Sequence, residues 1–230
     1  MSRIAILVSM AMALWLFMPL SSWADDVQEK LVKNVDLDKP FEADLKDVLT
    51  FLSDRFDLKI EVDQEAFAIE KRKDPIFFRV ASPPMPGVFL DTTLRFMLTQ
   101  ADAVYELRGK SIVVVPNRSK GLPVRFPDYT RAQKEEIRKR QKELEDRLLQ
   151  LRVETGNIDA SIKEALEFIT DAHKVAILID PKIKKIADSN VNLSKGTYTF
   201  DELMGQILKN TNATYKIRGD HILIVVESRS

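Results

Sequence analysis

The chain has 230 residues, 45% of them hydrophobic, with 35 basic and 35 acidic side chains and no cysteine. The absence of cysteine excludes disulfides, thiolate metal sites and a cysteine nucleophile. The even balance of charge argues against a nucleic-acid partner, which would require a clustered basic surface.

Residues 1–24 have the pattern of a signal peptide. Arg3 precedes the apolar run Ile4–Leu20, and Ser22-Trp23-Ala24 places small residues where a signal peptidase cuts. An uncleaved membrane anchor is the alternative, because a run of about 17 residues is close to the minimum that spans a bilayer. Pro19 and the small residues favour cleavage. The mature chain is then expected in the periplasm of a double-membraned bacterium, with no membrane insertion.

The elements that follow are read from hydrophobic spacing. A short strand is expected around Val35, and a helix over 45–56, where apolar residues recur at the i, i+3, i+4, i+7 and i+11 positions. Strands are predicted at Leu58–Val62 and Ile76–Val80. Residues 83–89 are rich in proline and read as a stiff loop that connects a strand to a helix.

A second helix and a hairpin complete this unit, which spans residues 30–117. The helix carries apolar residues from Leu94 to Ala101 on one face. The hairpin joins Val104–Leu107 to Ile112–Val115 through Gly109-Lys110, and glycine at the first loop position indicates a type II′ turn.

Residues 118–152 form a different kind of segment. A loop with Gly and Pro is followed by a highly charged helix over Thr130–Arg152. The helix is interpreted as a spacer that packs a thin apolar stripe on its neighbours, because two heptads are too few to establish a coiled coil. A seam that pairs helices between chains is the alternative. Both interpretations use the same residues, which are Ile137, Leu144, Leu148 and Leu151.

Residues 153–227 repeat the first unit. Residues 41–63 align with 158–180 at an offset of 117, with seven of 23 positions identical, and 88–115 align with 198–225 at an offset of 110. The repeated hairpin turn is Gly219-Asp220. The sequence therefore predicts an α+β fold of two repeated small β-α-β-β-α-β-β modules joined by a long charged helix.

Four segments carry a family resemblance. LDTTLRFML (90–98) and YELRGKSIVV (105–114) in the first copy, with VNLSKGTYTFDELMGQIL (191–208) and TYKIRGDHILI (214–224) in the second, resemble the secretin and TonB N-terminus short (STN) domain, here in two tandem copies. The resemblance implies non-catalytic periplasmic modules that dock on envelope partners. No secretin or receptor barrel is expected within these 230 residues, so the resemblance does not identify the partner.

The sequence offers no catalytic, cofactor-binding or metal constellation, and no cofactor is expected. His173 ends a helix stripe and is expected to be partly buried, whereas His221 is expected on the surface of a hairpin strand. Neither has the ligand spacing of a zinc site. Asp63 and Asp180 recur at matched positions, and each is interpreted as a helix N-cap.

Two features are candidates for protein binding. One is a sheet edge, to which an extended partner could add a strand, although edges are normally protected. The other is the proline-rich loop of the first copy, which the second copy lacks. If it docks on a partner, its residues are Pro83, Pro84, Met85, Pro86 and Phe89.

These observations predict a non-enzymatic periplasmic adaptor for an envelope assembly, with a secretin, pilus or TonB-linked system suggested by the resemblance. The alternative is a self-assembling structural envelope protein that uses the modules and the charged helix to oligomerise. An enzyme or small-ligand carrier would require a sizeable cavity with convergent polar groups.

Overall fold

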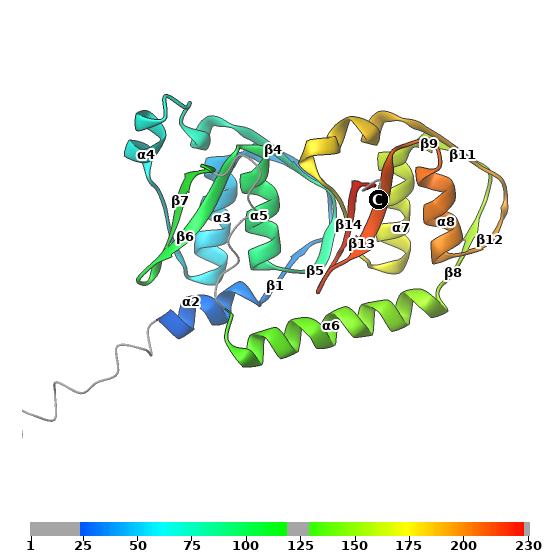
Figure 1. Ribbon diagram of the computed structural model, residues 1–230, viewed down its shortest axis with the longest axis horizontal. Coiled ribbons are helices and arrows are strands. Elements are labelled where there is room, and N and C mark those ends of the chain that lie inside the picture. Colours follow the sequence, from blue (N-terminus) through cyan, green and yellow to red (C-terminus); the bar gives the residue numbers. More distant parts are fainter. Residues whose placement is uncertain (1–23, 119–128, 228–230) are drawn as a thin grey trace, which may run out of the picture.

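The computed structural model describes residues 24–118 and 129–227 (Figure 1). Almost all of the predicted signal segment and the loop at 119–128 lie outside these ranges, so both stay predictions. Within the described ranges, no helix has the combined length and apolar character to cross a bilayer. Helices and small sheets are mixed throughout, and this confirms the α+β fold class.

The first half, residues 24–118, contains seven strands and several helices. α3 and α5 are its main helices, and they begin where apolar stripes begin. The elements are α2 (Ala24–Leu31), β1 (Asn34–Leu37), β2 (Phe41–Asp44), α3 (Leu45–Phe56), β3 (Lys59–Val62), α4 (Gln64–Ile69), η3 (Pro75–Phe77), β4 (Arg79–Ser82), β5 (Met85–Phe89), α5 (Leu90–Gln100), β6 (Ala103–Arg108) and β7 (Ser111–Pro116).

The second half, residues 129–227, has the same succession of strands and main helices after a long helix. Its elements are α6 (Arg131–Gln150), β8 (Arg152–Thr155), β9 (Ile158–Ser161), α7 (Ile162–His173), β10 (Ile177–Ile179), η4 (Pro181–Asp188), β11 (Asn190–Leu193), β12 (Gly196–Thr199), α8 (Phe200–Leu208), β13 (Ala213–Ile217) and β14 (Ile222–Val226).

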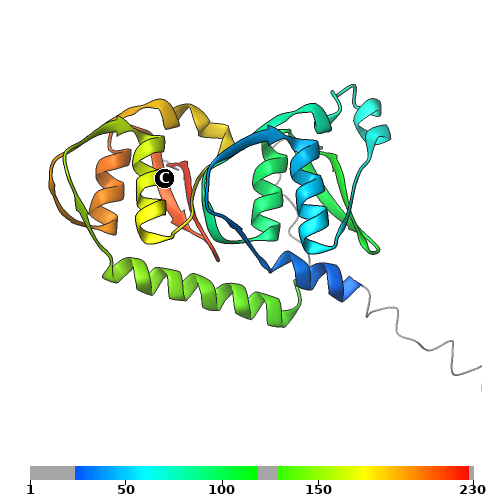
Figure 2. The same cartoon turned by 180° about the vertical axis from the view of Figure 1, so that it is seen from behind.

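Strand pairing follows one scheme in both halves. β1 pairs with β5 and β2 with β4, both antiparallel, and the third sheet has the order β3-β7-β6. The second half pairs β8 with β12, β9 with β11, and β10-β14-β13 in the same senses. Figure 2 shows α8, α7, α5 and α3 side by side on the opposite side from the three-stranded sheets.

The two halves share a buried contact. Each has its own apolar core, but the core of the first half also includes Ala176 and Leu178 from the second, both about 1% exposed. Leu223 of β14 packs against the same cluster. Burial of apolar side chains is the main stabilising term in folding, so this contact holds the halves together as well as filling a core.

Three sequence predictions about local structure are wrong. Residues 76–80 are not one strand: Asp74 caps the 3-10 turn η3, and β4 starts only at Arg79. Residues 85–89 are strand β5 rather than a loop. Gly109 has the positive φ of 63° that the predicted turn requires, but Gly219 does not have a positive φ. Glycine is needed there for space, because a Cβ on Gly219 would lie 2.6 Å from Ile137 Cγ2.

The charged helix is present as α6, and its apolar stripe faces its own chain. Leu144 and Leu148 are buried in the core of the second half, and Leu151 packs against that core. Ile137 is partly buried and lies against Gly219. The apolar stripe therefore packs against its own chain. This contradicts its use as a seam for pairing helices between chains and agrees with the packed-spacer interpretation.

The starts of α7 and α8 in the second half are fixed by capping boxes that contain a glutamate. Thr199 with Glu202 and Ser161 with Glu164 each bond reciprocally. The hydrogen bonds from the Ser161 and Thr199 backbone N–H groups, and then from their hydroxyls, hold the pKa of both glutamates below their ordinary value of 4.5.

Folding lowers these two pKa values, so the ionised glutamates stabilise the folded state. This stabilisation is complete above about pH 4.5, and it is lost as the pH falls through the lower pKa values of the folded state. We expect the double substitution Glu164→Gln, Glu202→Gln to flatten the fall of Tm below pH 4.5 with little change at pH 7, since glutamine can complete the same box. Exposed Glu154→Gln is the control. A double variant as acid-sensitive as the control would contradict this role.

Candidate functional site: the groove between the halves

A buried carboxylate joins the halves. Asp220, in the β13–β14 turn, has a side chain only 3% exposed. Its Oδ2 accepts a hydrogen bond from the Phe89 N–H at 2.5 Å, and its Oδ1 accepts one from the Thr92 hydroxyl at 3.2 Å. Phe89 is the N-cap residue of α5 and has no capping side chain of its own. Asp220 therefore satisfies the start of a helix in the other half.

Other contacts hold the two halves together at the same place, and we call this contact region around Asp220 and Phe89 the joint. His221 Nδ1 lies 2.7 Å from Asp220 Oδ1, and the His221 side chain is only 12% exposed. The prediction that His221 is a surface residue is therefore wrong, because the turn is buried against α5. From α6, Arg140 lies over the ring of Phe89 at 4.6 Å and donates to Asn34 Oδ1 at 2.7 Å. The joint thus combines apolar burial with hydrogen bonds and a cation–π contact.

Removing the shared cap should loosen the joint. We expect Asp220→Ala to lower the free energy of unfolding by about 1–2 kcal/mol, the usual cost of losing an N-cap. Lys110, at the aligned turn position of the first half, is exposed and serves as the control. Lys110→Ala should cost less than about 0.5 kcal/mol. Equal losses in urea titrations of the two variants would show that Asp220 does not act as a cap.

A second polar cluster lies at the edge of this joint. Asp91, 5% exposed, accepts hydrogen bonds from Arg95 Nε at 2.6 Å and from the hydroxyls of Tyr105 and Tyr129. Burial, and then the negative charge of Asp91, raises the pKa of Tyr105 and of Tyr129 well above the ordinary value, so both hydroxyls stay protonated and donate. Tyr129 thereby ties the start of α6 to α5. The cluster is structural.

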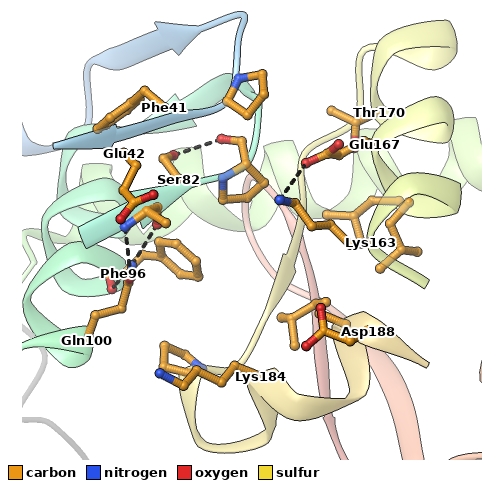
Figure 3. Close-up of a pocket in the computed structure, with 18 residues that line it drawn as sticks. Phe41, Glu42, Ser82, Phe96, Gln100, Lys163, Glu167, Thr170, Lys184 and Asp188 are labelled. Carbon is orange, nitrogen blue, oxygen red and sulfur yellow. Dashed lines mark hydrogen bonds and ion pairs between the residues drawn. The ribbon is translucent and has the colours of Figure 1, made fainter. Parts of the chain in front are cut away.

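Beside the joint, the halves enclose an open groove of about 600 Å³ (Figure 3). One wall is the β2–β4 ribbon of the first half, and α7 of the second half is the opposite wall. α5 and β10 contribute the surface between them, and η4 lies at one end. The groove exists only because the joint fixes the two halves beside each other. Its apolar lining includes Phe41, Phe96, Leu166, Ile177 and Ile179.

The polar groups of the groove are arranged for binding. Lys163 Nζ lies 4.0 Å from Glu167 Oε1 on α7, and Lys184 and Asp188 of η4 are exposed at the end. Across from them, the side-chain amide of Gln100 bonds to the backbone of Ala81 in β4. Apolar surface combined with a few oriented polar groups is the usual composition of a recognition site. The described residues hold no cluster of three or more His, Asp or Glu suited to a metal ion.

The proline-rich segment is placed differently from the predicted docking loop. Pro84, Met85 and Phe89 are buried, because β5 pairs with β1 and packs on the core. Pro86 is partly exposed but does not line this groove. Pro83 alone of the five predicted binding residues does. The structure therefore does not bring these residues together as an exposed surface.

The capping aspartates are where they were predicted. Asp63 accepts from the Ala66 N–H and Asp180 from the Lys182 N–H, so both act as N-caps. His173 is partly buried at the end of α7, as expected.

Sequence reasoning missed Asp220 and Gln100, yet one signal was present. The N-cap position of α5 holds Phe89 where the aligned position of α8 holds Thr199. A repeat that keeps a helix but loses its capping residue indicates that the cap comes from elsewhere.

Comparison with known proteins adds no relative: no family model, no curated protein and no solved structure matches this chain. The likeness to STN domains therefore rests on the sequence patterns alone.

Proposed function

We propose that this protein is a non-enzymatic adaptor of the bacterial cell envelope that binds a protein partner in the groove between its halves. The groove itself carries the proposal. It is lined from both halves, and their relative position is held by the buried Asp220 cap and by Leu178 in the core of the first half. A site built by two units with a buried joint needs little reorganisation on binding, and this favours affinity.

The envelope location of the proposal comes from the sequence. The signal-like segment 1–24 and the STN-like patterns both point to the periplasm, and an assembly of the secretin, pilus or TonB-linked kind is the corresponding class of partner. Mass spectrometry of the protein isolated from its host tests the location. A chain that begins at Asp25 supports export and cleavage, whereas one that retains residues 1–24 contradicts cleavage.

Photo-crosslinking in living cells tests the groove. A photoreactive amino acid in place of Lys184, which is exposed at the end of the groove, should give an adduct with another envelope protein. The control position is Lys142, exposed on α6 and not among the groove residues. An adduct from both positions, or from neither, would contradict binding in the groove.

Self-assembly remains the alternative function, but Leu144 and Leu148 of its expected seam along α6 are buried in the core of the second half. Adducts between two copies of this chain at Lys184 would support it. Light scattering after size-exclusion chromatography gives a second readout, and a monomer across the micromolar range would exclude it.

A further inference from the structure

We propose that the groove takes an extended peptide segment of its partner, which adds as a strand to the free edge of β4 after displacing the side chain of Gln100. The inference rests on the proposed function and specifies the chemistry of the partner that the groove would recognise.

Gln100 imitates a neighbouring strand. The Ala81 N–H donates to Gln100 Oε1 at 3.0 Å, and Gln100 Nε2 donates to the Ala81 C=O at 2.9 Å. Ala81 lies opposite Glu42 in the β2–β4 ribbon, but its own backbone groups are paired with this side chain. A primary amide carries the same donor and acceptor as a peptide unit. At Ala81 the edge is thus complementary to extended backbone and is covered by the side chain of Gln100.

The rest of the groove suits an extended segment. An edge strand supplies hydrogen bonds to a peptide backbone, while pockets beside it select alternate side chains. Here α7 faces the β4 edge across the groove, and Phe96 of α5 and Leu166 of α7 contribute apolar lining. β4 has four residues, so it can pair with a segment of about four residues, or about 13 Å of extended chain.

Charge in the groove favours a basic side chain on that segment. Two ammonium groups line it, on Lys163 and Lys184, against the carboxylates of Glu167, Asp188 and Glu42, the last of which pairs with Arg79 at 3.3 Å. Glu167 Oε1 is buried and has no hydrogen-bond partner, and the nearby Lys163 side chain is 60% exposed. A buried acceptor of this kind gains most from a charged donor. The expected segment alternates apolar residues with lysine or arginine.

The second half supplies a natural contrast. Asn210 aligns with Gln100 at the offset of 110, but it is exposed and makes no hydrogen bond to β11 within the described residues. The covered edge is therefore a property of the first half, on the side that faces α7. Asn210→Ala is a matched control for Gln100→Ala.

A displayed library of random linear nonapeptides, selected on the purified chain, provides the probe. Selected peptides should share alternating apolar and basic residues, and the best one is synthesised and titrated by fluorescence anisotropy. Gln100→Ala should bind it at least about fivefold more tightly, because two hydrogen bonds worth at least about 0.5 kcal/mol each no longer compete. Asn210→Ala should bind it with the wild-type affinity. Glu167→Gln should lose the preference for a basic residue.

Backbone methylation of the peptide identifies the mode of binding without altering the protein. Methylating one peptide N–H that pairs with the Ala81 C=O should weaken binding at least tenfold, whereas methylating the next amide, which points away, should not. Strand addition is overturned if both methylated peptides bind like the parent, or if Gln100→Ala and Asn210→Ala are indistinguishable.

The two proposals fail separately. If Lys184 crosslinks an envelope protein but the library yields no binder in the groove, the adaptor function stands and the peptide inference is overturned. If peptides bind with the expected dependence on Gln100 but Lys184 crosslinks nothing in cells, the peptide site is supported and the adaptor function falls.

Discussion

Replacing Asp91 by alanine is expected to lower the free energy of unfolding by about 3–5 kcal/mol, the usual cost of removing one partner from a buried ion pair. Asp91 is 5% exposed and accepts from Arg95, Tyr105 and Tyr129, so its loss leaves a guanidinium without its carboxylate and two phenols without their acceptor. Chemical denaturation followed by circular dichroism measures the change.

The second half provides the matched control. Asp201 aligns with Asp91 and accepts from the Tyr215 hydroxyl, but it is exposed on α8. We expect Asp201→Ala to cost less than about 1.5 kcal/mol, since water can replace the lost bond. Adding Arg95→Met to Asp91→Ala should recover part of the loss, because no buried charge then remains. Equal costs for Asp91→Ala and Asp201→Ala would contradict the structural role of the buried cluster.

Leu148→Ala should destabilise the protein by about 2–5 kcal/mol, the range measured for leucine truncations in cores. Leu148 is 4% exposed and belongs to the core of the second half, so its truncation leaves a cavity. The adjacent Leu149 is 71% exposed, and Leu149→Ala should change stability by less than about 0.5 kcal/mol. Thermal unfolding of both variants is the measurement.

Comparing Leu148→Ala with Leu149→Ala tests the role of α6. If Leu148→Ala left Tm unchanged but abolished self-association, the stripe would serve pairing between chains and the packed-spacer interpretation would fail. A large loss of Tm without any change in oligomeric state is the expected result.

Hydrophobic spacing predicted the helices and strands whose pattern lies within their own residues. The stripes of α3 and α7 follow helical spacing, and the hairpin β6–β7 alternates around Gly109, so each element is specified by near neighbours. β5 was missed because Pro84, Pro86 and Gly87 are typical of turns. Proline is tolerated in that strand because β5 lies at the edge of a two-stranded ribbon with β1.

The site was not predictable in the same way because it consists of contacts between distant residues. Asp220 and Phe89 are 131 positions apart, and the bonded pair Gln100 and Ala81 lies in a groove whose other wall belongs to the second half. Nothing in the sequence around Asp220 distinguishes a residue that caps a helix of the other half from an ordinary turn residue. The only indication in the sequence is at Phe89, where the aligned helix of the second half has a capping residue and this helix does not.

Scanning calorimetry of the purified chain most directly tests whether the two halves form one body. The buried Asp220 cap and the shared apolar cluster predict one transition, with a calorimetric enthalpy equal to the van't Hoff enthalpy. Two separate transitions would show that the halves unfold independently. The groove would then have no fixed walls, which would contradict the account.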